Sequence, residues 1–137
     1  TATGLGVAGR GVDPAMPSLP ARALVVEDDF LISRETMRVL GVLGCGDVDA
    51  VATNARALAS IEAGPPGFAV LDVNLKGQFS GPVAERLVER GVPFLFLTGF
   101  GSGELTLDRY PDVPVLTKPL KEGALRAALM ALFPQPA

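Results

Sequence analysis

Four short apolar runs in this chain each end on polar or charged residues. The runs cover 23–26, 68–71, 94–97 and 113–116, and they lead to Glu27-Asp28, Asp72, Thr98 and Thr117-Lys118. Continuous apolar runs of this length, separated by helix-length segments, are typical of parallel strands buried on both faces of a sheet. Residues 47–53 alternate apolar and polar positions and predict one further, short strand. We therefore predict a sheet of five strands.

Apolar residues at helical spacing predict helices between these strands. Asn54 is the expected N-cap of the second helix, and Gly81-Pro82 opens the third, because proline suits the first turn of a helix. The predicted helices span residues 30–43, 55–63, 81–90 and 120–132.

The remaining segments are expected to be connections. We predict a loop over 74–80, a flexible glycine-rich connection over 99–103, and at most a short helix over 104–110. Residues 1–20 are expected to be a flexible lead-in, linker or tag. The alternation of strands and helices, with right-handed crossovers, predicts an α/β fold with a doubly wound five-stranded parallel sheet in one domain over 21–134.

Composition narrows the classes of function. The net charge of -3 offers no basic surface, which argues against direct nucleic-acid binding, and no apolar run approaches the roughly 20 residues of a membrane span. The chain has one cysteine, Cys45, and no histidine, which excludes an internal disulfide and disfavours a zinc site or a histidine-based triad. A reducing cytoplasm is the expected compartment.

The polar strand ends predict one site. In an open α/β sheet, ligands bind at the carboxyl ends of the strands, so Glu27, Asp28 and Asp72 are expected to converge there. Such crowding of acids is costly unless a divalent cation neutralises it, and hard oxygen ligands suit Mg²⁺. A carboxylate can also act as a nucleophile and form an aspartyl-phosphate. Asp72 is the best nucleophile candidate because it ends the central strand.

These residues carry a resemblance to a known family. The chain from about 21 to 133 resembles a response-regulator receiver domain of two-component signalling, which has a flavodoxin-like (βα)5 fold. The motifs are Val25-Val26-Glu27-Asp28, Val70-Leu71-Asp72-Val73-Asn74, Leu97-Thr98-Gly99 and Thr117-Lys118-Pro119.

The resemblance implies a role for each site residue. Asp72 would be the phosphoacceptor, with Thr98 and Lys118 contacting the phosphoryl group. Mg²⁺ would be bound by Asp28 and Asp72, by Glu27 largely through water, and by the backbone carbonyl of Asn74. The Lys118-Pro119 bond is a candidate for the cis form.

A narrower resemblance is to the FATGUY class of receivers, which are often stand-alone regulators of alphaproteobacteria. It rests on the segment 96–101, together with 72–75 and 91–94. The match departs at Leu97, where that motif has alanine.

The signalling switch is expected to be unusual. Receivers usually carry a tyrosine or phenylalanine three residues before the lysine, and this chain has Val115 there. We therefore expect the glycine-rich connection to reorder around Thr98 on phosphorylation, with Gly99 and Phe100 taking part.

Several functions remain open at this level. The resemblance implies a protein that is not an enzyme, beyond gaining and losing its own phosphoryl group. It would receive that group from a histidine kinase or histidine phosphotransferase and act on an unknown output protein. The alternatives are the receiver segment of a hybrid histidine kinase and a constitutive docking module without chemistry. A dehalogenase-type phosphatase is disfavoured because Asn74 stands where that chemistry needs a second acid. The purely structural interpretation of residues 27–29 is a solvated acidic turn at the start of a helix.

Overall fold

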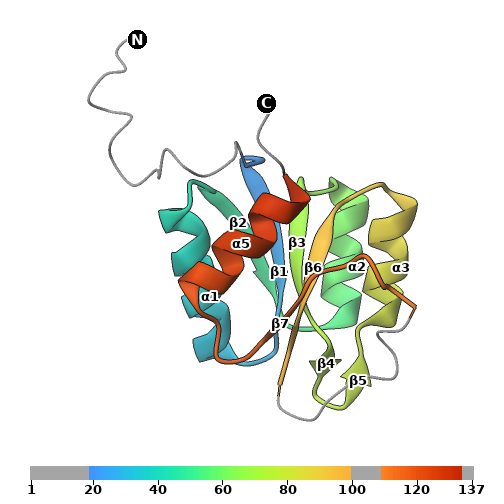
Figure 1. Ribbon diagram of the computed structural model, residues 1–137. Helices are drawn as coiled ribbons and strands as arrows, with labels where there is room; N and C mark the ends of the chain where they lie inside the picture. The colour runs from blue at the N-terminus through green and yellow to red at the C-terminus, as the bar shows by residue number, and fades with distance from the viewer. Residues whose placement is uncertain (1–18, 100–108, 134–137) are drawn as a thin grey trace.

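The computed structural model describes residues 19–99 and 109–133, and a five-stranded parallel sheet forms its centre (Figure 1). The sheet order is β2-β1-β3-β6-β7, and every neighbouring pair is parallel. The predicted doubly wound α/β sheet is therefore confirmed. Its strands are β1 (Arg22–Val26), β2 (Asp47–Val51), β3 (Phe68–Asp72), β6 (Phe94–Thr98) and β7 (Val115–Thr117).

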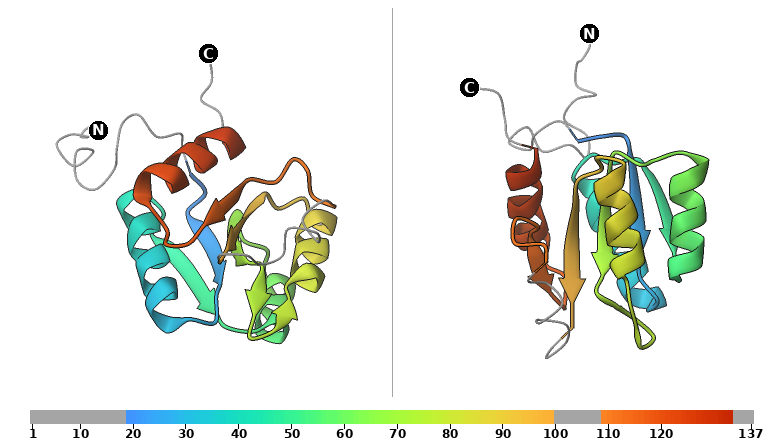
Figure 2. Two further views of the ribbon diagram at one scale, coloured as in Figure 1. Left: turned by 60° about the horizontal axis from the view of Figure 1, so that its bottom comes forward. Right: turned by 90° about the vertical axis from the view of Figure 1, so that its right-hand side faces the viewer.

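Within residues 19–99 and 109–133, four helices cover the two faces of the sheet. The views in Figure 2 place α1 and α5 on one face and α2 and α3 on the other. All four begin and end within two residues of the limits that the sequence predicts, because their apolar residues recur at helical spacing. The helices are α1 (Phe30–Val42), α2 (Asn54–Ala63), α3 (Gly81–Glu89) and α5 (Glu122–Leu132).

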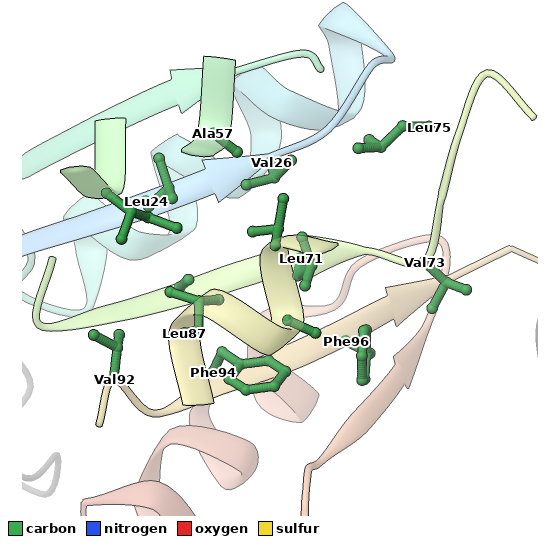
Figure 3. Close-up of a cluster of buried hydrophobic side chains, with 14 residues drawn as sticks. Leu24, Val26, Ala57, Leu71, Val73, Leu75, Leu87, Val92, Phe94 and Phe96 are labelled. Carbon is green, nitrogen blue, oxygen red and sulfur yellow. The ribbon is translucent and has the colours of Figure 1, made fainter. Parts of the chain in front are cut away.

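Each central strand contributes to two apolar layers. In β1, Ala23 and Val25 pack under α1 and α5, whereas Leu24 and Val26 pack under α2 and α3. Figure 3 shows the second layer, in which Leu71 of β3 and Phe96 of β6 lie in one cluster with Ala57 of α2 and Leu87 of α3. Every residue of β3 and β6 is buried. This burial on both faces explains why these strands are continuous apolar runs.

The expected loop over 74–80 is instead a β-hairpin, so that prediction is wrong. Strands β4 (Asn74–Leu75) and β5 (Gln78–Phe79) pair antiparallel through a two-residue turn, Lys76-Gly77. Both turn residues have positive φ, 52° and 88°, as the type I′ hairpin turn requires. The hairpin extends beyond the carboxyl end of β3 (Figure 1).

The N-cap predicted for α2 is also wrong by one residue. The Thr53 hydroxyl accepts a hydrogen bond from the Arg56 backbone N–H at 3.1 Å, so Thr53 is the cap. Asn54 is the first residue of the helix, and its side-chain amide donates to the Phe79 carbonyl at 3.2 Å. Asn54 therefore connects α2 to the hairpin.

Three further points complete the comparison with the sequence. The Lys118-Pro119 peptide bond is cis, as the family resemblance implied. Most of the predicted lead-in and most of the segment 104–110 lie outside the described residues. No helix in the described ranges is long and apolar enough to cross a membrane.

Candidate functional site

The site lies where the carboxyl ends of β1, β3 and β7 meet. The sheet order reverses between β1 and β3, and open α/β sheets bind ligands at such a switch point. Backbone hydrogen bonds continue one residue beyond the strands and fix these ends. The Glu27 N–H donates to the Val51 carbonyl at 3.0 Å, and the Lys118 N–H donates to the Thr98 carbonyl at 2.8 Å.

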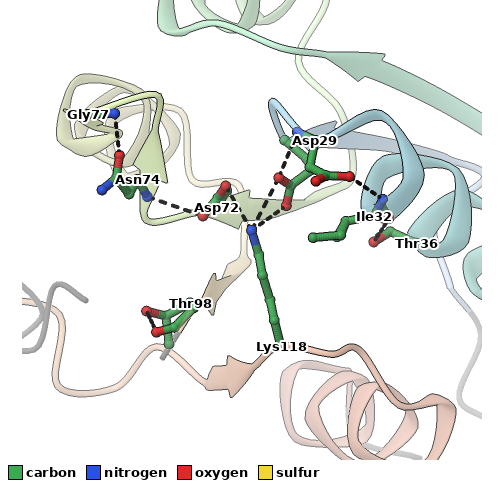
Figure 4. Close-up of polar contacts among 10 residues, drawn as sticks. Asp29, Ile32, Thr36, Asp72, Asn74, Gly77, Thr98 and Lys118 are labelled. Carbon is green, nitrogen blue, oxygen red and sulfur yellow. Dashed lines mark hydrogen bonds and ion pairs between the residues drawn. The ribbon is translucent and has the colours of Figure 1, made fainter. Parts of the chain in front are cut away.

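Lys118 brings two buried carboxylates together. Its ammonium nitrogen lies 3.1 Å from Asp72 Oδ2 and 3.1 Å from Glu27 Oε1 (Figure 4). Glu27 and Asp72 are each only 3% exposed. Ion pairs at this depth are screened much less by solvent than surface pairs, so the position of the Lys118 side chain is set largely by these two acids.

One ammonium group does not neutralise both carboxylates. Burial, followed by the nearby Glu27 charge, raises the pKa of Asp72 to about 7, and the Lys118 interactions only partly oppose this. Burial lowers the Lys118 pKa, but hydrogen bonds to Glu27 and Asp72 outweigh that effect and raise the pKa above its ordinary value. When both carboxylates are ionised, the single Lys118 charge leaves the site with excess negative charge.

Asp28 completes a set of oxygen ligands suited to a cation. One carboxylate oxygen from each of Glu27, Asp28 and Asp72 lies within 4.8 Å of the others. Hard carboxylate oxygens are the ligands that Mg²⁺ prefers, and the excess negative charge favours a divalent ion, so these residues fit the predicted metal.

The neighbouring Asp29 has a structural role. Its side chain accepts a hydrogen bond from the Ile32 N–H at 3.0 Å and caps α1. Its own N–H donates to Glu27 Oε2 at 3.0 Å, which helps to orient that carboxylate. Asp29 is exposed and does not belong to the group of three clustered acids. The acidic triplet is therefore more than a helix cap.

The backbone after β3 holds the other side of Asp72. The Asn74 N–H donates to Asp72 Oδ1 at 3.2 Å, and Asn74 Oδ1 accepts from the Gly77 N–H at 2.6 Å (Figure 4). The Asn74 side chain is thus used by the hairpin turn. The role of its backbone carbonyl as a metal ligand stays a prediction.

The predicted switch residues do not cluster around Asp72 as the acids and Lys118 do. The Thr98 hydroxyl donates to the Gly99 carbonyl at 3.1 Å, and Figure 4 draws Thr98 apart from the carboxylates. Gly99 lines the crevice above Asp72. Val115 begins the edge strand β7 opposite Phe96 and is 43% exposed. Phe100 lies outside the described residues.

The sequence analysis missed two residues, one at the site and one beside the apolar layer under α2 and α3. Lys76, at the hairpin tip, lines the same crevice as Asp72 and Lys118. Its sequence signal is the Lys76-Gly77 pair, which lies between two short segments that alternate polar and apolar residues. The Tyr110 ring packs edge-on against Phe96, with ring centroids 5.5 Å apart. No periodicity surrounds Tyr110, so the sequence offered no signal for this contact.

Comparison with solved structures gives clear similarities. SdrG from Sphingomonas melonis Fr1, in solution, aligns with a TM-score of 0.73 and 41% identity, covering 84% of this chain and 98% of SdrG. A BeF3-activated structure of SdrG, from Pseudomonas melonis Fr1, aligns with a TM-score of 0.71 at the same identity, covering 85% and 98% of the two chains.

Two solved structures with lower sequence identity to this chain also align with it. The PhyR response regulator REC domain of Erythrobacter litoralis has a TM-score of 0.73 and 28% identity, with coverage of 87% of this chain and 95% of that domain. A CheY-like response regulator receiver domain from Methylobacillus flagellatus has the same fold, with a TM-score of 0.70 and 23% identity over 84% and 99% of the two chains. No family model and no curated protein matches the sequence.

Proposed function

Because this chain belongs to the response-regulator receiver domains and resembles their FATGUY class, we propose that it accepts a phosphoryl group on Asp72. The donor would be a histidine kinase or a histidine phosphotransferase. One observation carries the proposal: Asp72 ends the central strand among three clustered acids, with the Lys118 ammonium 3.1 Å from its Oδ2.

In the proposed reaction, an Asp72 carboxylate oxygen attacks the phosphorus of a phosphohistidine. The phosphorus–oxygen bond forms as the phosphorus–nitrogen bond breaks, and the departing imidazole leaves as the neutral base after proton uptake. Lys118 holds the carboxylate through Oδ2 and offers its positive charge to the transferred group. Charge on the phosphoryl oxygens would be neutralised by Mg²⁺. The groups that would hold this ion are Asp28, Asp72, Glu27 and the Asn74 carbonyl.

The surroundings of the crevice support transfer from another protein. The crevice shares Ile32 and Lys118 with an apolar groove between α1 and the segment after β7. Leu31, which lines this groove, is 74% exposed. A partner seated in this groove would bring its phosphohistidine next to Asp72. This chain has no histidine, so it cannot itself supply the phosphohistidine.

Acetyl phosphate with Mg²⁺ tests the proposal directly. We expect the wild-type chain to gain the mass of one phosphoryl group and Asp72→Asn to gain none. Asp29→Asn is the matched control, because it changes a neighbouring acid outside the clustered three while keeping a good helix cap, and it should still gain the group. A gain that survives in Asp72→Asn would refute the assignment. No gain in any variant, together with no Mg²⁺ binding, would favour a docking module without chemistry.

A further inference from the structure

Lys76 occupies a backbone position that disfavours lysine. It has a φ of 52°, and it is the only non-glycine residue in the described ranges with positive φ. The first central position of a type I′ turn favours asparagine, aspartate or glycine, and other L-residues there pay roughly 1 kcal/mol or more. The turn conformation therefore does not favour lysine at this position. A function of the Lys76 side chain would explain why lysine is found there.

The hairpin holds Lys76 at a fixed place relative to Asp72. Asn74 bridges the Asp72 carboxylate and the Gly77 N–H, and the Ser80 N–H donates to the Val73 carbonyl at 3.0 Å. Leu75 is only 4% exposed and packs in the apolar layer under α2 and α3. The turn is thus held in place through both β4 and β5. This fixes the backbone from which the Lys76 side chain extends.

The charges around the crevice leave a place for a second cation. Lys118 is engaged with Glu27 and Asp72, whereas Lys76 is exposed and forms no ion pair with any described residue. The crevice lining has four acids and two lysines, which are Glu27, Asp28, Asp29, Asp72, Lys76 and Lys118. A phosphoryl group on Asp72 would add about one more negative charge on this open side.

We propose that Lys76 contacts the phosphoryl group on Asp72 and slows its hydrolysis, an inference that rests on the proposed function. In hydrolysis, a water oxygen attacks the phosphorus and the bond to Asp72 breaks. The carboxylate is regained, inorganic phosphate leaves, and a water proton passes to solvent. The Lys76 ammonium pairs with a phosphoryl oxygen at the crevice mouth, where it obstructs the approach of that water.

The test separates the charge of Lys76 from its backbone. Lys76→Asn removes the charge but places a favoured residue in the turn, whereas Lys76→Arg keeps the charge. Lys121→Asn is the charge control, because Lys121 is exposed at the start of α5 and does not line the crevice. Each protein is phosphorylated with acetyl phosphate and Mg²⁺, freed of donor, and followed by intact mass as the phosphoryl group is lost.

We expect Lys76→Asn to lose the phosphoryl group about three- to five-fold faster than wild type, the effect of one exposed charge pair. Its affinity for beryllofluoride, a phosphoryl mimic, should fall by a similar factor, while its melting temperature stays equal or rises. Lys76→Arg and Lys121→Asn should match wild type. A purely structural role would instead lower the melting temperature and leave beryllofluoride affinity unchanged.

The outcomes distinguish this inference from the function on which it rests. If all variants accept the phosphoryl group on Asp72 and lose it at one rate, the role of Lys76 is refuted and the receiver function stands. If Lys121→Asn accelerates the loss as much as Lys76→Asn, net charge and not Lys76 is responsible, which also refutes the inference. If the wild-type protein gains no phosphoryl group, both proposals are wrong.

Discussion

The Lys118 ammonium lies 3.1 Å from Asp72 Oδ2, although the two residues are 46 positions apart in the chain. The same nitrogen also pairs with Glu27 at 3.1 Å, so Asp72 shares its cation. This sharing leaves Asp72 with a pKa of about 7, which burial and the Glu27 charge produce. Asp72 is therefore a poor nucleophile in acid, where it is protonated. When ionised, it lowers the stability of the folded protein, and both properties can be measured.

The first prediction concerns pH and stability without metal. Unfolded Asp72 releases its proton near pH 3.8, whereas the folded protein keeps it up to about pH 7. The folded state binds more protons across this window, so the Asp72 contribution to stability falls as pH rises from about 4 to 7. Asp72→Asn removes that slope. We expect its stability advantage over wild type to grow by on the order of 2 kcal/mol between pH 4.5 and 7.5.

Denaturant unfolding in a chelator measures this difference. Groups remote from Asp72 titrate alike in the two proteins and cancel, so the pH-dependent difference reports Asp72 together with its direct partners Glu27 and Lys118. A stability difference that is constant across the pH range would mean that Asp72 has an ordinary pKa in the folded protein.

The second prediction removes the shared cation. Lys118→Met leaves Glu27 and Asp72 buried without their ammonium partner, and breaking a buried ion pair in this way typically costs about 3 kcal/mol. We expect that loss at pH 7.5 and a smaller one at pH 5, where Asp72 can be protonated. Arg38→Met is the control, because its pair with Glu35 is exposed and its removal should have little effect. Equal losses at both pH values would contradict the electrostatic explanation.

Much of the fold could be predicted because each central strand is apolar on both faces. Alternate residues of β1, such as Val25 and Val26, enter opposite layers, so the whole run is hydrophobic and easily recognised. The strand ends then placed Glu27, Asp28, Asp72 and Lys118 at one edge without any knowledge of long-range contacts. In this part of the protein, local pattern and tertiary structure agree.

The hairpin was missed because the sequence carries only part of the signal for it. Its turn needs positive φ at Lys76 and Gly77, and only the glycine suggests that from sequence. Either Thr53 or Asn54 can cap α2, and the choice depends on the Phe79 carbonyl, which binds the Asn54 amide from a distant segment. For the α2 cap, a contact between residues far apart in the chain decided between two local alternatives.

The third prediction tests how tightly the hairpin meets α3. A β-carbon on Gly81 would lie 2.6 Å from the edge of the Phe79 ring, so Gly81→Ala must displace that ring. We expect a loss of about 1–3 kcal/mol in the free energy of unfolding. Gly41→Ala is the contrasting variant, since nothing lies within 4 Å of that position in α1. It should gain about 0.5–1 kcal/mol from better helix propensity. Equal effects of the two substitutions would show that Phe79 does not press on Gly81.

The fourth prediction uses the two neighbouring acids at the end of β1 to locate the metal. A ligand that binds only the folded state at one hundred times its Kd stabilises the protein by about 2.7 kcal/mol, so Mg²⁺ should raise the melting temperature of the wild type. Asp28→Asn removes one of the three clustered carboxylates and should abolish most of that rise. Asp29→Asn should keep it, because Asp29 caps α1 and asparagine caps as well. Thermal unfolding of the three proteins with Mg²⁺ and with chelator makes the comparison. If Asp29→Asn loses the response and Asp28→Asn keeps it, the cation binds toward the α1 cap and not among Glu27, Asp28 and Asp72.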